Sequence, residues 1–112
     1  MTTTQMKAGD LEPDLVADLV ASPTTTNLNL VSSWRIIGRL MGETALIVDA
    51  VPTVDVDDVD AYRAVAIHQW TGTQTAVAGL MLLEIEATWP SGAKQTFPTD
   101  DYIRVRINED LG

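Results

Sequence analysis

Four aspartates stand close together in the segment Asp55–Asp60, interspersed with two valines. Carboxylate oxygens at this density suit Ca²⁺, which takes six to eight oxygen ligands. An EF-hand loop, however, needs a Gly at its sixth position and a Glu at its twelfth, and a loop that began at Asp55 would have neither. We therefore predict a solvated, turn-forming acidic loop and no metal site.

His68 is the only histidine, and it is the one candidate for a general base at neutral pH. A base needs a nucleophile or water beside it and a second group that orients its ring. The chain has no cysteine and no serine in a nucleophile-elbow motif. His68 lies in an alternating segment between Ala66 and Trp70, so we predict a packed strand residue.

Glu84 and Glu86 lie two residues apart on one predicted strand face, like the paired carboxylates of a glycosidase. If their strand runs antiparallel to the last strand, Glu84 faces Arg106 and Glu86 faces Arg104. Such cross-strand pairs help to fix register. We predict a structural role for them, and hence no catalytic residue, no cofactor-binding residue, no cofactor and no metal ligand. The chain is not expected to be an enzyme.

Three tryptophans, Trp34, Trp70 and Trp89, each lie on a predicted strand or at its end. Core packing is the usual role of such residues. An exposed Trp34 or Trp89 would instead offer a platform for carbohydrate or for a protein partner.

The composition limits the classes of partner. The chain has 112 residues, with 16 acids against 7 bases, a formal net charge of −9 and no cysteine. A negative field repels phosphate backbones and anionic lipid, so we expect no nucleic-acid or membrane partner. The N-terminus has no apolar signal segment, and no apolar run approaches the roughly 20 residues of a membrane helix. We expect a soluble protein made in the cytoplasm.

Period-2 alternation of β-branched and other apolar residues is the main secondary-structure signal. It predicts an all-β fold, a sandwich or a barrel, of about seven to eight strands, with residues 1–8 as a flexible N-terminal arm and residues 9–112 as a single domain. The clearest strands are 62–70, 80–89 and 102–107. The range 44–51 reads as a fourth strand, and 28–40 contains one or two more. Pro13–Val20 is ambiguous, because its apolar residues recur at i, i+1, i+4 and i+5 after a proline that suits a first helical turn.

A distinctive order of aromatic, glycine and Thr-Phe-Pro residues runs through the second half of the chain. It occupies Trp70–Leu80, Leu83–Gly92 and Thr96–Pro98, with looser correspondence at Gly9–Leu11 and Leu30–Ile36. In this order the sequence resembles the small β-sandwich domain at the N-terminus of phage upper baseplate (BppU-type) proteins. Their pattern runs Trp, a Gly-Asp-Thr turn, Ala-Gly, a strand with an aromatic residue and Glu, a Gly hairpin, and Thr-Phe-Pro.

The sequence departs from that pattern at three places. Thr73-Gln74-Thr75 stands where Gly-Asp-Thr is usual, Met81 replaces an aromatic residue, and His68 replaces a strand tyrosine. The resemblance favours a strand over a helix for Leu11–Val20.

The resemblance implies an immunoglobulin-like antiparallel β-sandwich that is a virion component of a tailed phage, made in the host cytoplasm. In such relatives this domain attaches a receptor-binding or fibre module to the tail. This sequence ends a few residues after its closing strand, so we expect a free-standing baseplate connector, minor tail protein or capsid decoration. Its partners would be other virion proteins and copies of itself, contacted through sheet edges, loops and termini, with Met1–Lys7 ordered on a partner. The alternative is a carbohydrate-binding adhesion module of a phage or bacterial surface.

Overall fold

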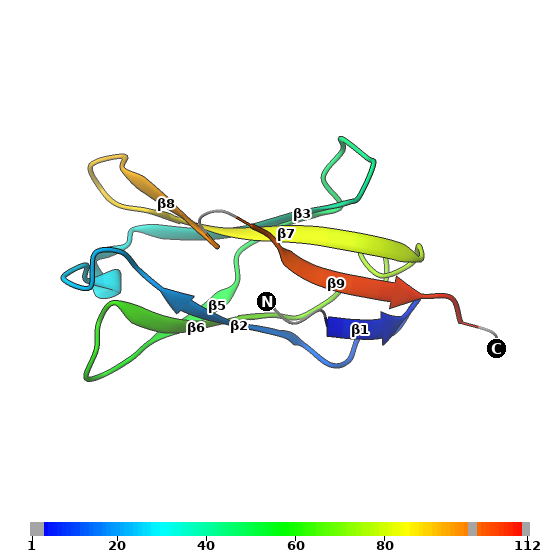
Figure 1. Cartoon of the computed structure of the whole chain (residues 1–112), viewed down its shortest axis with the longest axis horizontal. Coiled ribbons are helices and arrows are strands. Elements are labelled where there is room, and N and C mark those ends of the chain that lie inside the picture. Colours follow the sequence, from blue (N-terminus) through cyan, green and yellow to red (C-terminus); the bar gives the residue numbers. More distant parts are fainter. Residues whose placement is uncertain (1–3, 99–100, 111–112) are drawn as a thin grey trace.

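The computed structural model describes residues 4–98 and 101–110, and they form a two-layered sandwich of nine strands (Figure 1). The described part has one helical element, the 3₁₀ turn η1 (Leu28–Leu30), and contains no helix long and apolar enough to cross a bilayer. The strands are β1 (Thr4–Lys7), β2 (Leu15–Val20), β3 (Ser33–Leu40), β4 (Val48–Ala50), β5 (Thr53–Val56), β6 (Arg63–His68), β7 (Gly79–Thr88), β8 (Lys94–Phe97) and β9 (Ile103–Asn108).

Two sheets make up the layers. The larger sheet has the order β1-β9-β7-β3-β4, with β8 also paired to β7, and the smaller sheet has the order β2-β6-β5. Strands β9, β7, β3 and β4 of the larger sheet correspond to strands G, F, C and C′ of an immunoglobulin-type sandwich. Strands β2, β6 and β5 of the smaller sheet correspond to strands B, E and D. The all-β sandwich predicted from the sequence is confirmed, with nine strands among the described residues instead of about seven to eight. One pairing, between β1 and β9, is parallel, and the others are antiparallel.

Strand β7 shows how the alternation builds the core. Its odd-numbered residues Met81, Leu83, Ile85 and Ala87 are buried, whereas Glu84 and Glu86 lie on the opposite, half-exposed face. The same pattern holds on β9, where the isoleucines and valine point inward and the arginines outward. The inward faces of both sheets therefore meet in one apolar layer.

Strand β2 settles the ambiguity of Pro13–Val20 in favour of a strand. Leu15 and Leu19 are buried, and Val16 and Val20 are exposed on the outer face. Spacing by four residues places the two leucines on one face of a strand as well as near one face of a helix. Pairing with β6 along the whole of β2 decides between them.

Residues 4–7, expected to belong to a flexible arm, form strand β1. They pair with β9 from Thr4 opposite Val105 to Lys7 opposite Asn108, and Met6 is buried in the core. The correction has a physical reason: the open edge of β9 offers unpaired main-chain groups to which a strand can add, and Met6 then fills an inward position in the core. Residues 1–3 of the expected arm lie outside the described residues.

The predicted pairing of Glu84 with Arg106 and of Glu86 with Arg104 is wrong. Arg106 lies opposite Leu80, and Arg104 lies opposite Leu82. Strand β8, which we did not predict, occupies the edge of β7 beside Ile85–Thr88, so β9 pairs with the preceding half of β7 instead. The register is therefore four residues away from the predicted one.

We predict that Leu83→Ala and Leu82→Ala differ sharply in stability, because the two side chains point to opposite faces of β7. Leu83 is fully buried, so its truncation should lower the free energy of unfolding by about 2–5 kcal/mol. Leu82 is half-exposed, so its truncation should cost less than about 1 kcal/mol. Equal losses in denaturant unfolding would contradict the facing of β7.

Candidate interaction surface

His68 is a buried residue at the end of β6, as its alternating segment predicts. Its Nε2 lies 2.8 Å from Oε1 of Gln74, and the same oxygen accepts a hydrogen bond from the backbone N–H of Thr71 at 3.1 Å. The ring of Trp70 stands edge-on to the imidazole, with centroids 5.0 Å apart. The histidine therefore joins the strand end to the turn that follows it.

Two further hydrogen bonds close this end of the sandwich. The indole N–H of Trp70 donates to the carbonyl of Pro13 at 3.0 Å, and the hydroxyl of Thr75 donates to the carbonyl of Asp10 at 2.9 Å. Thr75 is fully buried, and its own carbonyl accepts from the N–H of Gly9 at 2.8 Å. The loop after β6 is thus tied to the segment between β1 and β2, and nothing in the sequence signalled this connection.

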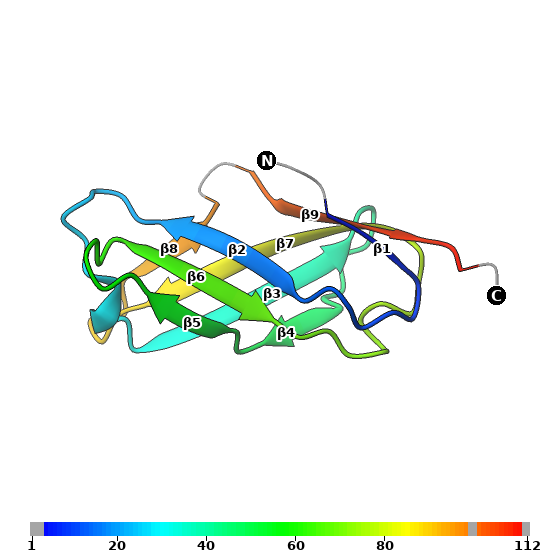
Figure 2. The same cartoon turned by 90° about the horizontal axis from the view of Figure 1, so that it is seen from below.

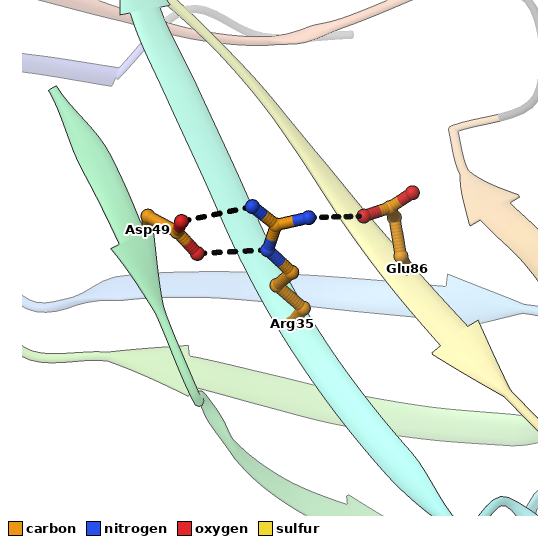
Figure 3. Close-up of polar contacts among 3 residues, drawn as sticks. All are labelled: Arg35, Asp49 and Glu86. Atoms are coloured by element: carbon orange, nitrogen blue, oxygen red, sulfur yellow. Dashed lines mark hydrogen bonds and ion pairs between the residues drawn. The ribbon is translucent and has the colours of Figure 1, made fainter. Parts of the chain in front are cut away.

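The most connected polar group is an ion-pair cluster on the outer face of the larger sheet (Figure 3). Arg35 on β3 donates two hydrogen bonds to the carboxylate of Asp49 on β4, at 2.7 and 2.8 Å, and its third nitrogen lies 3.6 Å from a carboxylate oxygen of Glu86 on β7. The hydrogen bond from Arg35 lowers the pKa of Asp49 below its ordinary value. Arg35 and Asp49 satisfy each other, and Glu86 lies within ion-pair distance of the same guanidinium, so the cluster links three neighbouring strands and helps to fix their register.

The acidic segment Asp55–Asp60 is divided between strand and turn. Asp55 belongs to β5, and Asp57 Oδ1 accepts hydrogen bonds from the N–H groups of Val59 at 2.8 Å and Asp60 at 2.9 Å. These backbone donors, that of Asp60 foremost, lower the pKa of Asp57. Within residues 4–98 and 101–110, no three acidic or histidine side chains converge so as to hold a metal ion. Asp57 therefore caps the turn that leads into β6.

The aromatic side chains line the interior. Trp34 is half-buried on the inward face of β3, with its ring 6.3 Å from that of Phe97, and Trp89 is half-buried against the core. Trp70 is buried, and both tyrosines are half-buried. The exposed platform that a carbohydrate site at Trp34 or Trp89 requires is not formed by these side chains.

The outer edge of β2 leaves main-chain groups without partners among the described residues. The N–H of Ala21 donates to the carbonyl of Tyr62 at 2.8 Å. In an antiparallel pair such bonds involve alternate residues, so Leu15, Ala17 and Leu19 also direct their main-chain groups to β6. The N–H and C=O groups of the intervening residues, Val16, Asp18 and Val20, point away from the sheet. Figure 2 shows β2 at one edge of the smaller sheet, with β5 at the other.

An apolar groove of about 540 Å³ runs beside this edge. Side chains of β2 form one wall, and Phe97, Pro98 and Ile103, from the junction of β8 and β9, line the other. A free strand edge next to an apolar groove can accept an extended segment, which adds main-chain hydrogen bonds and buries alternate side chains. This β2 groove is the candidate interaction surface of the described residues.

We predict that Gln74→Leu destabilises the fold, because it leaves the buried His68 and the N–H of Thr71 without their acceptor. The free energy of unfolding should fall by about 1–3 kcal/mol. Gln69→Leu is the matched control, since Gln69 is exposed and lies next to His68 in the chain. Equal losses for both variants would show that the Gln74 amide does not support the histidine.

We predict that Arg35→Met raises the pKa of Asp49 towards its ordinary value. The folded-state pKa of Asp49 is lowered, so the ion pair stabilises the fold above the unfolded-state pKa of about 3.9 and loses that effect as pH falls through the folded-state value. An NMR titration of the carboxylate measures the change. Arg104→Met should leave Asp49 unaffected, because Arg104 pairs with Asp101 instead. An unchanged Asp49 titration in Arg35→Met would contradict the assignment.

Comparison with known proteins identified no relative of this chain. No protein-family model matches the chain, and no curated protein matches it.

Proposed function

We propose that this chain is a structural component of the virion of a tailed phage, serving as a baseplate connector, minor tail protein or capsid decoration. The observation that carries the proposal is the β2 groove, where three residues direct unpaired main-chain groups outward beside an apolar wall. A surface of this kind binds protein segments in extended conformation. The role involves contacts with other virion proteins and with copies of the chain, and no catalysis, cofactor, nucleic acid or membrane.

The resemblance to the upper baseplate domain supports the proposal through residues that build the scaffold. Trp70 and Phe97 are buried, Gly92 adopts a positive φ of 88° in the hairpin between β7 and β8, and Gly79, at φ 150°, begins β7. These residues explain why the order and spacing of the motif matter although none of its members is chemically reactive. These scaffold residues support the type of domain that we propose. The β2 groove supports the kind of partner that the domain would contact.

The alternative, a carbohydrate-binding adhesion module, requires aromatic rings presented to solvent. The exposed large apolar side chains of the described residues are aliphatic, including Val16, Val51 and Val59. Aliphatic side chains suit protein contacts better than sugar stacking. We therefore favour the structural role.

The direct test is to purify the particles encoded by the genome that carries this chain, to detect the chain by mass spectrometry and to locate it by cryo-electron microscopy. We expect ordered copies at symmetric positions on the tail or capsid. Absence from the mature particle would overturn the proposal.

The β2 groove makes a sharper prediction. Val16→Pro removes an outward N–H that no described residue uses, so it should preserve the fold and block an added strand. We expect unchanged thermal unfolding and at least about a tenfold loss of incorporation into particles, as a loss of about 1.4 kcal/mol implies. Val16→Thr keeps the N–H and is the matched control. Normal incorporation of Val16→Pro would exclude strand addition at β2.

A further inference from the structure

The outer face of the larger sheet carries a row of two arginines with a leucine between them. Arg104 on β9 lies opposite Leu82 on β7, and Leu82 lies opposite Arg39 on β3. All three side chains point outward, because their neighbours on each strand are inward-facing. Adjacent strands are about 4.8 Å apart, so the Cα atoms of the two arginines stand about 10 Å apart, with the leucine between them.

The outer face of the smaller sheet carries the complementary row. Asp18 on β2 lies opposite Val65 on β6, and Val65 lies opposite Asp55 on β5. Both aspartates are exposed, and the valine between them is half-exposed. The strand spacing again sets the Cα atoms of the two aspartates about 10 Å apart, so this row has the same backbone width as the first and carries the opposite charge.

The rows next to these match as well. Along the centre of the larger sheet the outward residues are Leu80, Leu82 and Glu84. Along the centre of the smaller sheet, read in the opposite direction, they are Ile67, Val65 and Arg63. If the two faces stack in this register, apolar residues meet at the first two positions and Glu84 meets Arg63 at the third. Successive positions are about 7 Å apart along each strand.

We propose that these two faces bind each other between copies of this chain, with the outer face of the larger sheet of one copy stacked on the outer face of the smaller sheet of the next. This inference rests on the proposed structural role and names one partner for it, a second copy. The two faces are different, so the contact is heterologous and repeats in one direction, giving a ring or a filament of copies.

The charges on both faces are available for such a contact. Arg39 makes no ion pair with any described residue and donates only to the carbonyl of Glu43. Arg104 is paired with Asp101 at 2.8 Å on the surface, and it would be shared with the acids of the neighbour. Val16 and Val20, which flank Asp18 on β2, are 60% and 54% exposed and would be covered. The net charge of −9 opposes association at long range, and salt screens that repulsion beyond about 10 Å at 0.1 M.

Charge reversal on each face tests the contact. Sedimentation velocity of the purified wild-type chain should show association that rises with concentration and weakens at least about tenfold as the salt is raised from about 0.1 M to about 1 M. The double variants Arg39→Glu/Arg104→Glu and Asp18→Lys/Asp55→Lys should each be monomeric. Their equimolar mixture should associate again, because each reversed face meets a face of opposite charge.

Matched controls separate the faces from net charge. Asp10→Lys/Glu109→Lys changes the net charge as much as Asp18→Lys/Asp55→Lys does, at exposed positions outside both rows. It should associate as the wild type does. Circular dichroism of every variant confirms that it is folded. A monomeric wild type, or a mixture that stays monomeric, would overturn the inference.

Crosslinking tests the register. The chain has no cysteine, so Leu82→Cys in one sample and Val65→Cys in another introduce single thiols. Facing sheets pack about 10 Å apart, too far for a disulfide, so a short bis-maleimide is the probe. We expect a crosslinked heterodimer from Leu82→Cys with Val65→Cys and little from Thr88→Cys, at the far end of β7, with Val65→Cys. The reverse result would overturn the stacked register.

These outcomes are independent of the particle experiment. A chain that is monomeric in solution but present in the particle would reject the self-contact and retain the structural role. A chain that stacks through these faces but is absent from the particle would do the opposite.

Discussion

The alternation of side chains along β7 is the constraint on which the sandwich depends. This strand pairs with β3 on one side and with β8 and β9 in turn on the other, so its backbone is held on both sides over most of its length. Its inward residues are fully or almost fully buried, and its outward residues include two glutamates. A shift of one residue would place the glutamates in the core, where an unpaired carboxylate is costly, so the register of the larger sheet is fixed here.

The ends of the sandwich are held without disulfide bonds. In antibody domains a bridge joins the two sheets, but this chain has no cysteine. Hydrogen bonds from Trp70 and Thr75 to carbonyls of the segment before β2 fix one end, and the parallel pairing of β1 with β9 attaches the chain start to the larger sheet. These buried hydrogen bonds take the place of a covalent connection. Removing one partner of such a bond leaves the other buried and unpaired, which lowers the stability of the fold.

The edges of the sheets differ in their protection. Strand β9 is covered by β1, and β5 carries a charged residue, Asp55, at one of its two exposed positions, which discourages the approach of a like-charged strand. Strand β2 has neither cover nor a break in its ladder, and it adjoins an apolar groove. Charge is segregated as well, since six of the seven basic residues lie on the larger sheet: Lys7, Arg35, Arg39, Lys94, Arg104 and Arg106. The basic residues are therefore concentrated on one of the two layers.

The sequence by itself determined the β class, the strands β3, β4, β6, β7 and β9, and the inward and outward faces of β7 and β9. The physical reason is that side chains along a strand alternate between its two faces, so the order of residues shows which of them point inward. The same alternation indicated that His68 is a packed strand residue. The tertiary structure alone decided that residues 4–7 are a strand and that β8 displaces β9 along β7, since pairing partners depend on contacts between distant segments. The ion-pair cluster of Arg35, the β2 groove and the two matching rows of charge likewise arise from registers between strands, which a sequence pattern local to one strand does not specify.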